Sequence, residues 1–179
     1  MTNRKTLVMP ISSHYWKAIG LLIFMSCVAN GCSDRADPVD LFDNGDYVQA
    51  FKIFSDLAQR GDISACNYLG THYYLGLGVE RDFKQAVRWF EAAALAEDPQ
   101  GQRNLGVMYL RGLGVEKDYQ QAYGWLYLAY EGGNVGAKHY LALMNDNVTP
   151  NASGLARRNV RKKIDTHAAK RLHSNTETR

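Results

Sequence analysis

Apolar positions in the middle of the chain follow the spacing of a helix face. From Asp46 onward they fall at i, i+3, i+4, i+7 and i+8, at Ala50, Ile53, Phe54, Leu57 and Ala58. A polar break at 60–62 separates this segment from a second apolar helix, expected from about Ser64. Glycines at 76 and 78 then provide a helix stop, because glycine tolerates the left-handed conformation. Residues 46–81 are therefore predicted to form a helical hairpin.

The same pattern recurs with a period of 36 residues. Rows that begin at Asp46, Asp82 and Asp118 align without a gap through Asp146. Each initial Asp is a predicted N-cap, since its carboxylate can accept free backbone N–H groups. Small residues recur in two columns of the second helices, 65/101/137 and 70/106/142, where they allow close helix approach. The period predicts three stacked hairpins, 46–81, 82–117 and 118–149.

These rows resemble the Sel1-like repeats, which are relatives of tetratricopeptide repeats. The second row carries the family motif almost completely, in Ala86-Val-Arg-Trp89-Phe90-Glu-Ala-Ala93-Ala94 and in Asn104-Leu105-Gly106-Val-Met-Tyr109-Leu-Arg-Gly112-Leu-Gly114-Val115. The first row has Ile53 in place of Trp, and the third lacks the final Gly-x-Gly-Val. The resemblance covers roughly 40–150 and implies an all-α fold, a right-handed α/α solenoid, with a role in binding proteins.

A further helix is expected after the third hairpin. Thr149 is its predicted N-cap and Pro150 its first helical residue. Residues 150–169 are predicted to form a C-terminal capping helix whose sparse apolar side is Leu155, Val160 and Ile164. The polar residues 170–179 are predicted to be disordered.

The first 31 residues have the organisation of an export signal. Basic residues precede an apolar run at 18–29, which is too short to span about 30 Å of hydrocarbon as a helix. The segment Ala29-Asn30-Gly31-Cys32 resembles the lipobox of bacterial lipoproteins, although the family usually has Leu where Ala29 stands. The resemblance implies lipidation of Cys32, and Ser33 then favours the outer membrane, on its periplasmic face. A plain secretory signal and an uncleaved membrane anchor are the alternatives.

Charge and cysteine content refine this organisation. Residues 32–154 carry 10 basic and 16 acidic side chains, a net charge of −6, whereas 155–179 carry eight basic and two acidic, a net charge of +6. Residues 32–45 contain several aspartates and are predicted to be a soluble tether. Cleavage and lipidation would leave Cys66 as the single free cysteine, so the mature chain would have no intramolecular disulfide. The basic C-terminal segment suits acidic lipids, nucleic acid or an acidic partner, or is a solvated helix face.

No motif for catalysis, cofactor binding or metal ligation is recognisable in the sequence. Ser-x-x-Lys, His-Glu-x-x-His, Cys-x-x-Cys and Gly-x-Ser-x-Gly are all missing, and the five histidines lie at no metal-ligand spacing. His72 shares its column with Met108 and Met144, which indicates a partly buried packing residue. Cys66 shares its column with Gln102 and Lys138, which predicts a solvent-facing thiol. We expect a non-enzymatic protein and no cofactor.

The predicted partner-binding surface is the flank of the first helices. Helix geometry places one column of apolar and aromatic residues beside the packed face, at Phe51, Val87, Tyr123 and Tyr127. Such a column either forms a groove for a peptide or is covered by neighbouring helices. The sequence thus favours a protein-binding adaptor or scaffold at the bacterial cell envelope. A penicillin-recognising or cell-wall-processing enzyme and an RNA-binding repeat protein that uses the basic C-terminal segment are the alternatives.

Overall fold

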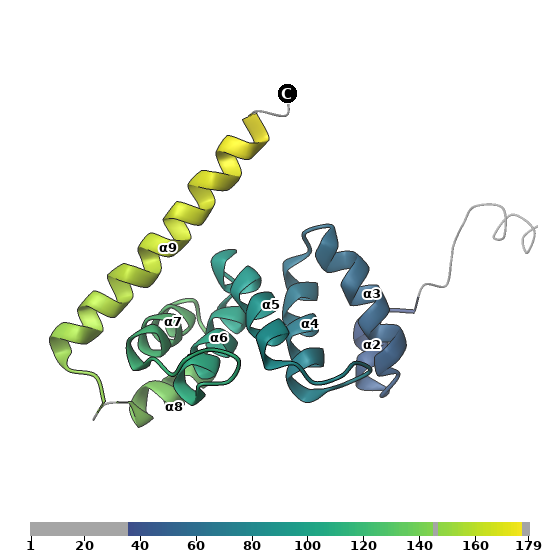
Figure 1. Cartoon of the computed structure of the whole chain (residues 1–179), viewed down its shortest axis with the longest axis horizontal. Coiled ribbons are helices and arrows are strands. Elements are labelled where there is room, and N and C mark those ends of the chain that lie inside the picture. Colours follow the sequence, from purple (N-terminus) through teal and green to yellow (C-terminus); the bar gives the residue numbers. More distant parts are fainter. Residues whose placement is uncertain (1–35, 145–146, 177–179) are drawn as a thin grey trace, which may run out of the picture. The chain divides into compact units, whose positions relative to one another are not determined.

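The computed structural model describes residues 36–144 and 147–176, and within them all regular structure is α-helical. The helices are α2 (Pro38–Asp43), α3 (Tyr47–Gln59), α4 (Ile63–Leu75), α5 (Phe83–Leu95), α6 (Pro99–Arg111), α7 (Tyr119–Glu131), α8 (Gly136–Leu143) and α9 (Pro150–Thr176) (Figure 1). The chain divides into two units, Met1–Asp37 and Pro38–Arg179, and these helices belong to the second. The prediction of an all-α, right-handed α/α solenoid is confirmed. The predicted signal peptide and Cys32 lie outside the described residues.

Three helical hairpins, α3–α4, α5–α6 and α7–α8, stack in chain order, and each helix contacts the next. The small residues of the second helices permit this stacking. A Cβ atom on Gly70 would overlap the Phe90 ring of the following hairpin, and one on Gly106 would lie 2.7 Å from Cγ of Leu126. Glycine at these positions therefore sets the distance between consecutive hairpins.

The aspartates that begin the rows do not all cap their helices. Oδ1 of Asp82 accepts hydrogen bonds from the backbone N–H groups of Lys84 and Gln85, at 2.8 and 3.1 Å. Asp118 caps α7 in the same way, at 2.8 and 2.9 Å. Asp46 forms no side-chain capping bond, so the prediction is wrong for the first row. Its backbone has φ −77° and ψ 53°, outside the extended conformation of the other two caps.

The glycine-rich ends of the first two hairpins are stops, as predicted. Gly76 and Gly112 have left-handed backbones, with φ of 74° and 69°. Gly78 and Gly114, also left-handed, lie where the turn returns to the first helix of its own hairpin. A Cβ on Gly114 would overlap the Phe83 carbonyl, so the turn requires a residue without a side chain.

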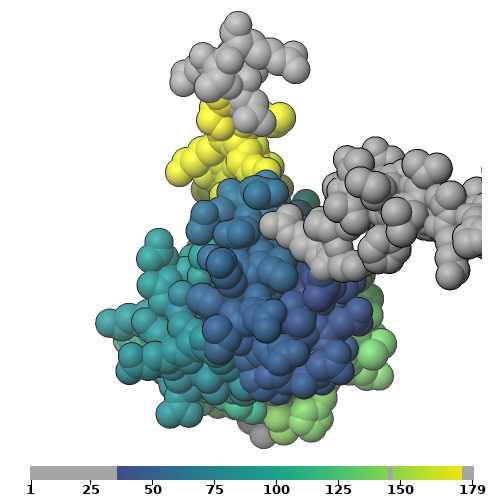
Figure 2. Space-filling model, turned by 90° about the vertical axis from the view of Figure 1, so that its right-hand side faces the viewer, coloured from purple at the N-terminus to yellow at the C-terminus, as the bar shows by residue number. Residues whose placement is uncertain are grey.

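Part of the predicted tether is structured. Residues 38–43 form α2, which lies against α3 (Figure 2). Its Phe42 ring lies 5.5 Å from the ring of Tyr47 and 5.4 Å from that of Tyr68. The aspartates suggested a soluble segment, but Val39, Leu41 and Phe42 supply an apolar side that covers the first hairpin. A terminal repeat needs such a cover because it lacks a neighbour.

The C-terminal helix is longer than predicted. α9 continues to Thr176, so the prediction of disorder is wrong for residues 170–176. Thr149 caps it as expected, with Oγ1 3.3 Å from the Ala152 backbone N–H. Val160 and Ile164 are buried together with Ala156, whereas Leu155, assigned to the apolar side, is 45% exposed. After Gly154, α9 contains no glycine or proline that would stop it earlier.

α9 returns across the first helices of the second and third hairpins. It contacts α7 and α5, and Val160 and Ile164 share one apolar cluster with Val87, Phe90 and Trp125. Burial of Val160 and Ile164 stabilises this arrangement by about 1.5–3 kcal/mol for each side chain.

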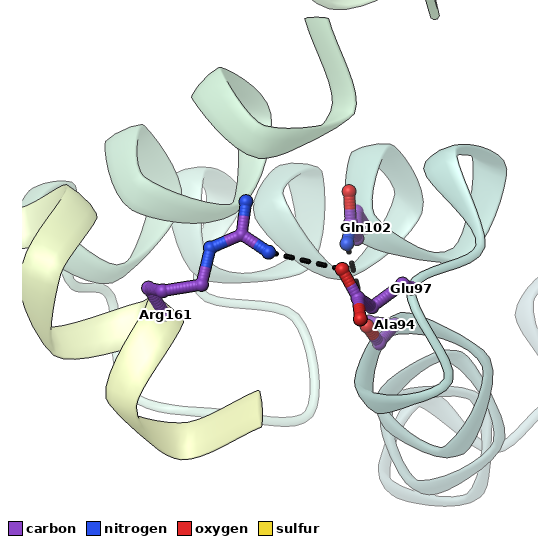
Figure 3. A network of polar contacts seen from close by, with 4 residues as sticks. All are labelled: Ala94, Glu97, Gln102 and Arg161. Carbon is purple, nitrogen blue, oxygen red and sulfur yellow. Dashed lines mark hydrogen bonds and ion pairs between the residues drawn. The ribbon is translucent and has the colours of Figure 1, made fainter. Parts of the chain in front are cut away.

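An ion pair adds to this contact: Nη1 of Arg161 lies 2.9 Å from Oε2 of Glu97, in the turn between α5 and α6 (Figure 3). Glu97 has a left-handed backbone, with φ 62°, at a row position that is glycine in the other two hairpins. Both side chains are largely exposed, so the pair contributes at most about 1 kcal/mol.

Candidate partner-binding site

The structure does not expose the predicted column on the first helices as one groove. Val87 is only 7% exposed, because Val160 and Ile164 of α9 belong to the cluster that covers it. At Val87 the structure therefore agrees with the second alternative, cover by a neighbouring helix. Phe51, Tyr123 and Tyr127 are partly buried, and partner binding by these three residues stays a prediction.

Gly124 explains how α9 reaches this flank. A Cβ atom on Gly124 would lie 2.6 Å from Cγ2 of Val160 and 2.8 Å from the Ala156 carbonyl oxygen. The same column holds Lys52 and Arg88 in the first two rows. The exchange of a long basic side chain for glycine in the third row makes room for the C-terminal helix. Arg157 of α9 also lies over the Tyr127 ring, with its guanidinium carbon 4.3 Å from the ring centroid.

A groove lies instead along the second helices, α4, α6 and α8. It consists of two adjoining hollows of about 330 and 400 Å³ that share Thr71, Gln100 and Asn104. We refer to them together as the second-helix groove. Its apolar and aromatic lining comes from Tyr68, Tyr74, Leu75, Phe90, Val107, Met108 and Tyr140, and its polar lining from Ser64, Asn67, Asp98, Arg103 and Arg111. The groove combines aromatic surface with a few polar groups, as binding sites commonly do.

Side-chain amides link consecutive hairpins on the floor of this groove. Nδ2 of Asn67 donates to Oδ2 of Asp98 at 2.8 Å, and Nδ2 of Asn104 donates to Oδ1 of Asn67 at 3.1 Å. The same Asp98 oxygen accepts the Gly101 backbone N–H at 2.7 Å and so caps α6. The chain of hydrogen bonds fixes the orientation of both asparagines across two hairpins.

Two arginines place positive charge in the second-helix groove. Nη1 of Arg111 donates to the Tyr74 hydroxyl at 3.3 Å, and the Arg103 guanidinium lies over the Tyr140 ring, 6.0 Å from its centroid. Within residues 36–144 and 147–176 neither guanidinium forms an ion pair. A ligand in this groove would thus meet two guanidinium groups that aromatic side chains position.

His72 is a packing residue, and its burial is complete. Its side chain is 0% exposed, and the rings of Phe42, Phe51 and Phe54 lie 5.2, 5.6 and 5.9 Å from its own. Nδ1 is 2.6 Å from the Leu77 carbonyl oxygen, and buried Nε2 has no hydrogen-bond partner among residues 36–144 and 147–176. Burial lowers the pKa of His72 below its ordinary value, and the hydrogen bond to Leu77 opposes this only in part. His72 is therefore neutral and unavailable to a ligand.

Cys66 is buried rather than solvent-facing, so its predicted exposure is wrong. It is 7% exposed and belongs to the apolar cluster of the first hairpin. Gln102, in the same column, is 3% exposed, with Nε2 3.5 Å from the Ala94 carbonyl oxygen (Figure 3). The polar residues of the column suggested exposure, but Gln102 is buried, and of the three only Lys138 is exposed. Burial, and secondarily the charge of Asp62, raises the pKa of the Cys66 thiol, which disfavours the nucleophilic thiolate.

The second-helix groove was not predicted, although the sequence contains a signal for it. Most packing columns hold similar residues in every row, whereas the groove columns differ, as in Tyr68, Asn104 and Tyr140. Variation of residue type between rows is typical of surface positions, although the column of buried Cys66 and Gln102 varies as well.

The described residues, 36–144 and 147–176, contain no group of three or more His, Cys, Asp or Glu side chains suited to a metal ion. In the same ranges, none of the helices combines the length and the hydrophobicity that crossing a bilayer requires.

Comparison with known proteins agrees with this architecture. The sequence model of the Sel1 repeat matches residues 63–98 and 99–134. These two segments of the chain are therefore similar to Sel1 repeats. The matched segments run from α4 to the α5–α6 turn and from α6 to the α7–α8 turn, so each joins the second helix of one hairpin to the first helix of the next. Sel1 repeats typically form protein-interaction scaffolds.

Solved structures with Sel1 repeats have similar folds. A Sel1 repeat protein from Oxalobacter formigenes aligns with a TM-score of 0.57 at 28% identity, over 60% of this chain and 44% of that chain. A protective antigen present in uropathogenic Escherichia coli strains, which displays an SLR fold, aligns with a TM-score of 0.54 at 31% identity. That alignment covers 65% of this chain and 26% of the antigen, so the chain spans less than half of either protein. No curated protein matches the sequence.

Proposed function

We propose that this protein is a non-enzymatic scaffold that holds an extended segment of a partner protein in the second-helix groove. The observation that carries the proposal is the continuity of this groove across consecutive hairpins. Its shared residues, Thr71, Gln100 and Asn104, come from α4 and α6, so a single bound segment would contact both repeats. Tyr74 and Tyr140 offer rigid aromatic surface, which contributes strongly to protein interfaces.

Site-specific crosslinking in cells tests the groove. A photo-reactive amino acid replaces Thr71, and a second variant carries it at Arg88, an exposed position on α5 outside the groove. We expect a discrete crosslinked partner from the first variant, and loss of that product when Tyr74→Ala is added. Identical products from both positions, or a product that survives Tyr74→Ala unchanged, would refute binding in the groove.

We also propose that the scaffold works at the bacterial cell envelope, anchored by a lipid on Cys32. The lipobox-like segment 29–32 and the apolar run before it support this location. Acyl chains would anchor the protein by about 0.8 kcal/mol per buried CH₂ group. Growth with an alkyne-labelled fatty acid should label the wild-type protein and leave Cys32→Ser unlabelled. Equal labelling of both proteins, or no labelling of either, would contradict the anchor.

A further inference from the structure

The basic side chains of α9 differ in the interactions that they form with the rest of the protein. Arg157 lies over Tyr127, and Arg161 forms the ion pair with Glu97. Three lysines lie on another side of the helix, at Lys162, Lys163 and Lys170, and we refer to them as the lysine flank. Within the described part of the chain none of the three forms an ion pair. Lys163 makes one neutral contact, in which Nζ donates to Oε1 of Gln121 at 2.9 Å.

The lysine flank borders a hollow of about 570 Å³. One wall is α9, which adds Asn159, Thr166 and His167 to the three lysines. The opposite wall comes from the first helices, with Glu91 and Leu95 of α5 and Gln121 of α7. Three ammonium groups thus face one carboxylate, which gives the hollow a net positive charge. Fixed charge in a recess attracts an anionic partner more strongly than the same charge on a flat surface.

We propose that this hollow binds an extended acidic segment of a partner protein. Lys163, His167 and Lys170 lie about one helical turn apart, and a turn rises about 5.4 Å. Alternate residues of an extended peptide lie about 6.6 Å apart on one side of its backbone. A segment with Asp or Glu at every second position therefore brings a carboxylate close to each turn of the helix. Asn159, Thr166 and Gln121 supply hydrogen-bonding groups for its backbone.

The surroundings favour a short acidic segment over a membrane or a nucleic acid. A flat lipid surface would meet the outer side of α9, whereas this hollow lies between α9 and the helices α5 and α7. A long polyanion would extend beyond the hollow onto residues 32–154, which carry a net charge of −6.

The proposal does not depend on the second-helix groove, because the two share no residue. A protein with both surfaces would contact a partner, or two partners, on α4, α6 and α8 and again beside α9.

A binding measurement with a defined probe tests the lysine flank. The probe is a fluorescent peptide of alternating Glu and Ser, titrated with the full-length protein at low salt and followed by fluorescence anisotropy. We expect Lys163→Ala with Lys170→Ala to weaken binding by about tenfold, since two charge contacts are lost. The matched control removes the same charge from exposed positions that do not line the hollow, with Arg158→Ala and Arg171→Ala. We expect less than about a threefold change from the control.

Each other outcome overturns the proposal. Equal weakening by the lysine and arginine pairs would mean attraction by net charge alone. Absence of peptide binding would refute the site directly. Tighter, lysine-dependent binding of a single-stranded oligonucleotide, or of vesicles with anionic phosphatidylglycerol, would assign the hollow to those ligands instead. Tyr74→Ala serves as a separate control: it should leave peptide binding unchanged, whatever it does to crosslinking in the second-helix groove.

Discussion

Replacement of Gly124 by alanine tests whether α9 is held against the hairpins by close contact of the two helices. Alanine normally stabilises a helix interior by about 1 kcal/mol relative to glycine. Here the added Cβ would meet Cγ2 of Val160 at 2.6 Å and the Ala156 carbonyl oxygen at 2.8 Å. The second neighbour is backbone, so α9 as a whole must move. Overpacking of this kind costs about 1–3 kcal/mol.

We therefore expect Gly124→Ala to lower the free energy of unfolding by up to about 2 kcal/mol, after subtraction of the gain in helix propensity. The matched control is Gly154→Ala in α9, where the nearest atom to an added Cβ is Nη1 of Arg158 at 3.8 Å. That variant should gain up to about 1 kcal/mol, because only helix propensity changes.

Urea unfolding of the full-length proteins, followed by circular dichroism, measures both values. Hydrogen exchange adds a local measurement, since amides of α9 between Ala156 and Ile164 should exchange faster in Gly124→Ala than in the wild type. If Gly124→Ala stabilises the protein as Gly154→Ala does, and α9 keeps its protection, then the close contact between α7 and α9 does not exist as described.

Three further predictions concern buried and capping groups. His72 has a pKa below its ordinary value of 6.5, so the folded protein binds fewer protons than the unfolded chain. The free energy of unfolding should fall as the pH drops below 6.5, by at most about 1.4 kcal/mol per pH unit. His72→Met should make the urea midpoint depend less on pH. Equal pH dependence of the midpoint in the wild type and the variant would contradict this. Asp118→Ala should lower the free energy of unfolding in urea by about 1 kcal/mol, whereas Asp46→Ala should lower it by less than about 0.5 kcal/mol. Equal losses would show that the two aspartates cap their helices alike. Cys66 should resist alkylation by iodoacetamide in the native protein and react in urea, because burial both shields the thiol and raises its pKa. Mass spectrometry of the tryptic peptide that contains Cys66 measures the extent of alkylation. Rapid alkylation of the native protein would argue against that burial.

The repeat architecture was predictable because every row restates the same packing columns. Ala50, Ala86 and Ala122 are each fully buried, as their shared position in the three rows implies. The Gly-x-Gly turns were predictable for the same reason, since a left-handed backbone leaves little choice of residue. These features recur in each repeat, so alignment of the rows was sufficient to predict them.

Features that depend on contacts between unlike segments were missed. The position of α9 depends on Gly124, a single departure from the basic residues in its column, and that departure was not interpreted as a contact. Cover of Val87 by α9 could not be inferred from helix geometry, because the covering residues lie more than seventy positions later in the sequence. Burial of Cys66 was missed because the other residues of its column, Gln102 and Lys138, are polar, although Gln102 is itself buried.

The return of α9 across α5 and α7 has a mechanical consequence. Repeat stacks ordinarily transmit load only between neighbours, but here one long helix braces the second and third hairpins together through Val160 and Ile164. The first hairpin is held by α2, by its contacts with α5, and by hydrogen bonds from Asn104 and Arg111 of α6 to α4. Force applied from the N-terminal side would therefore detach α3 and α4 first, and α5 to α9 would unfold together at a higher force.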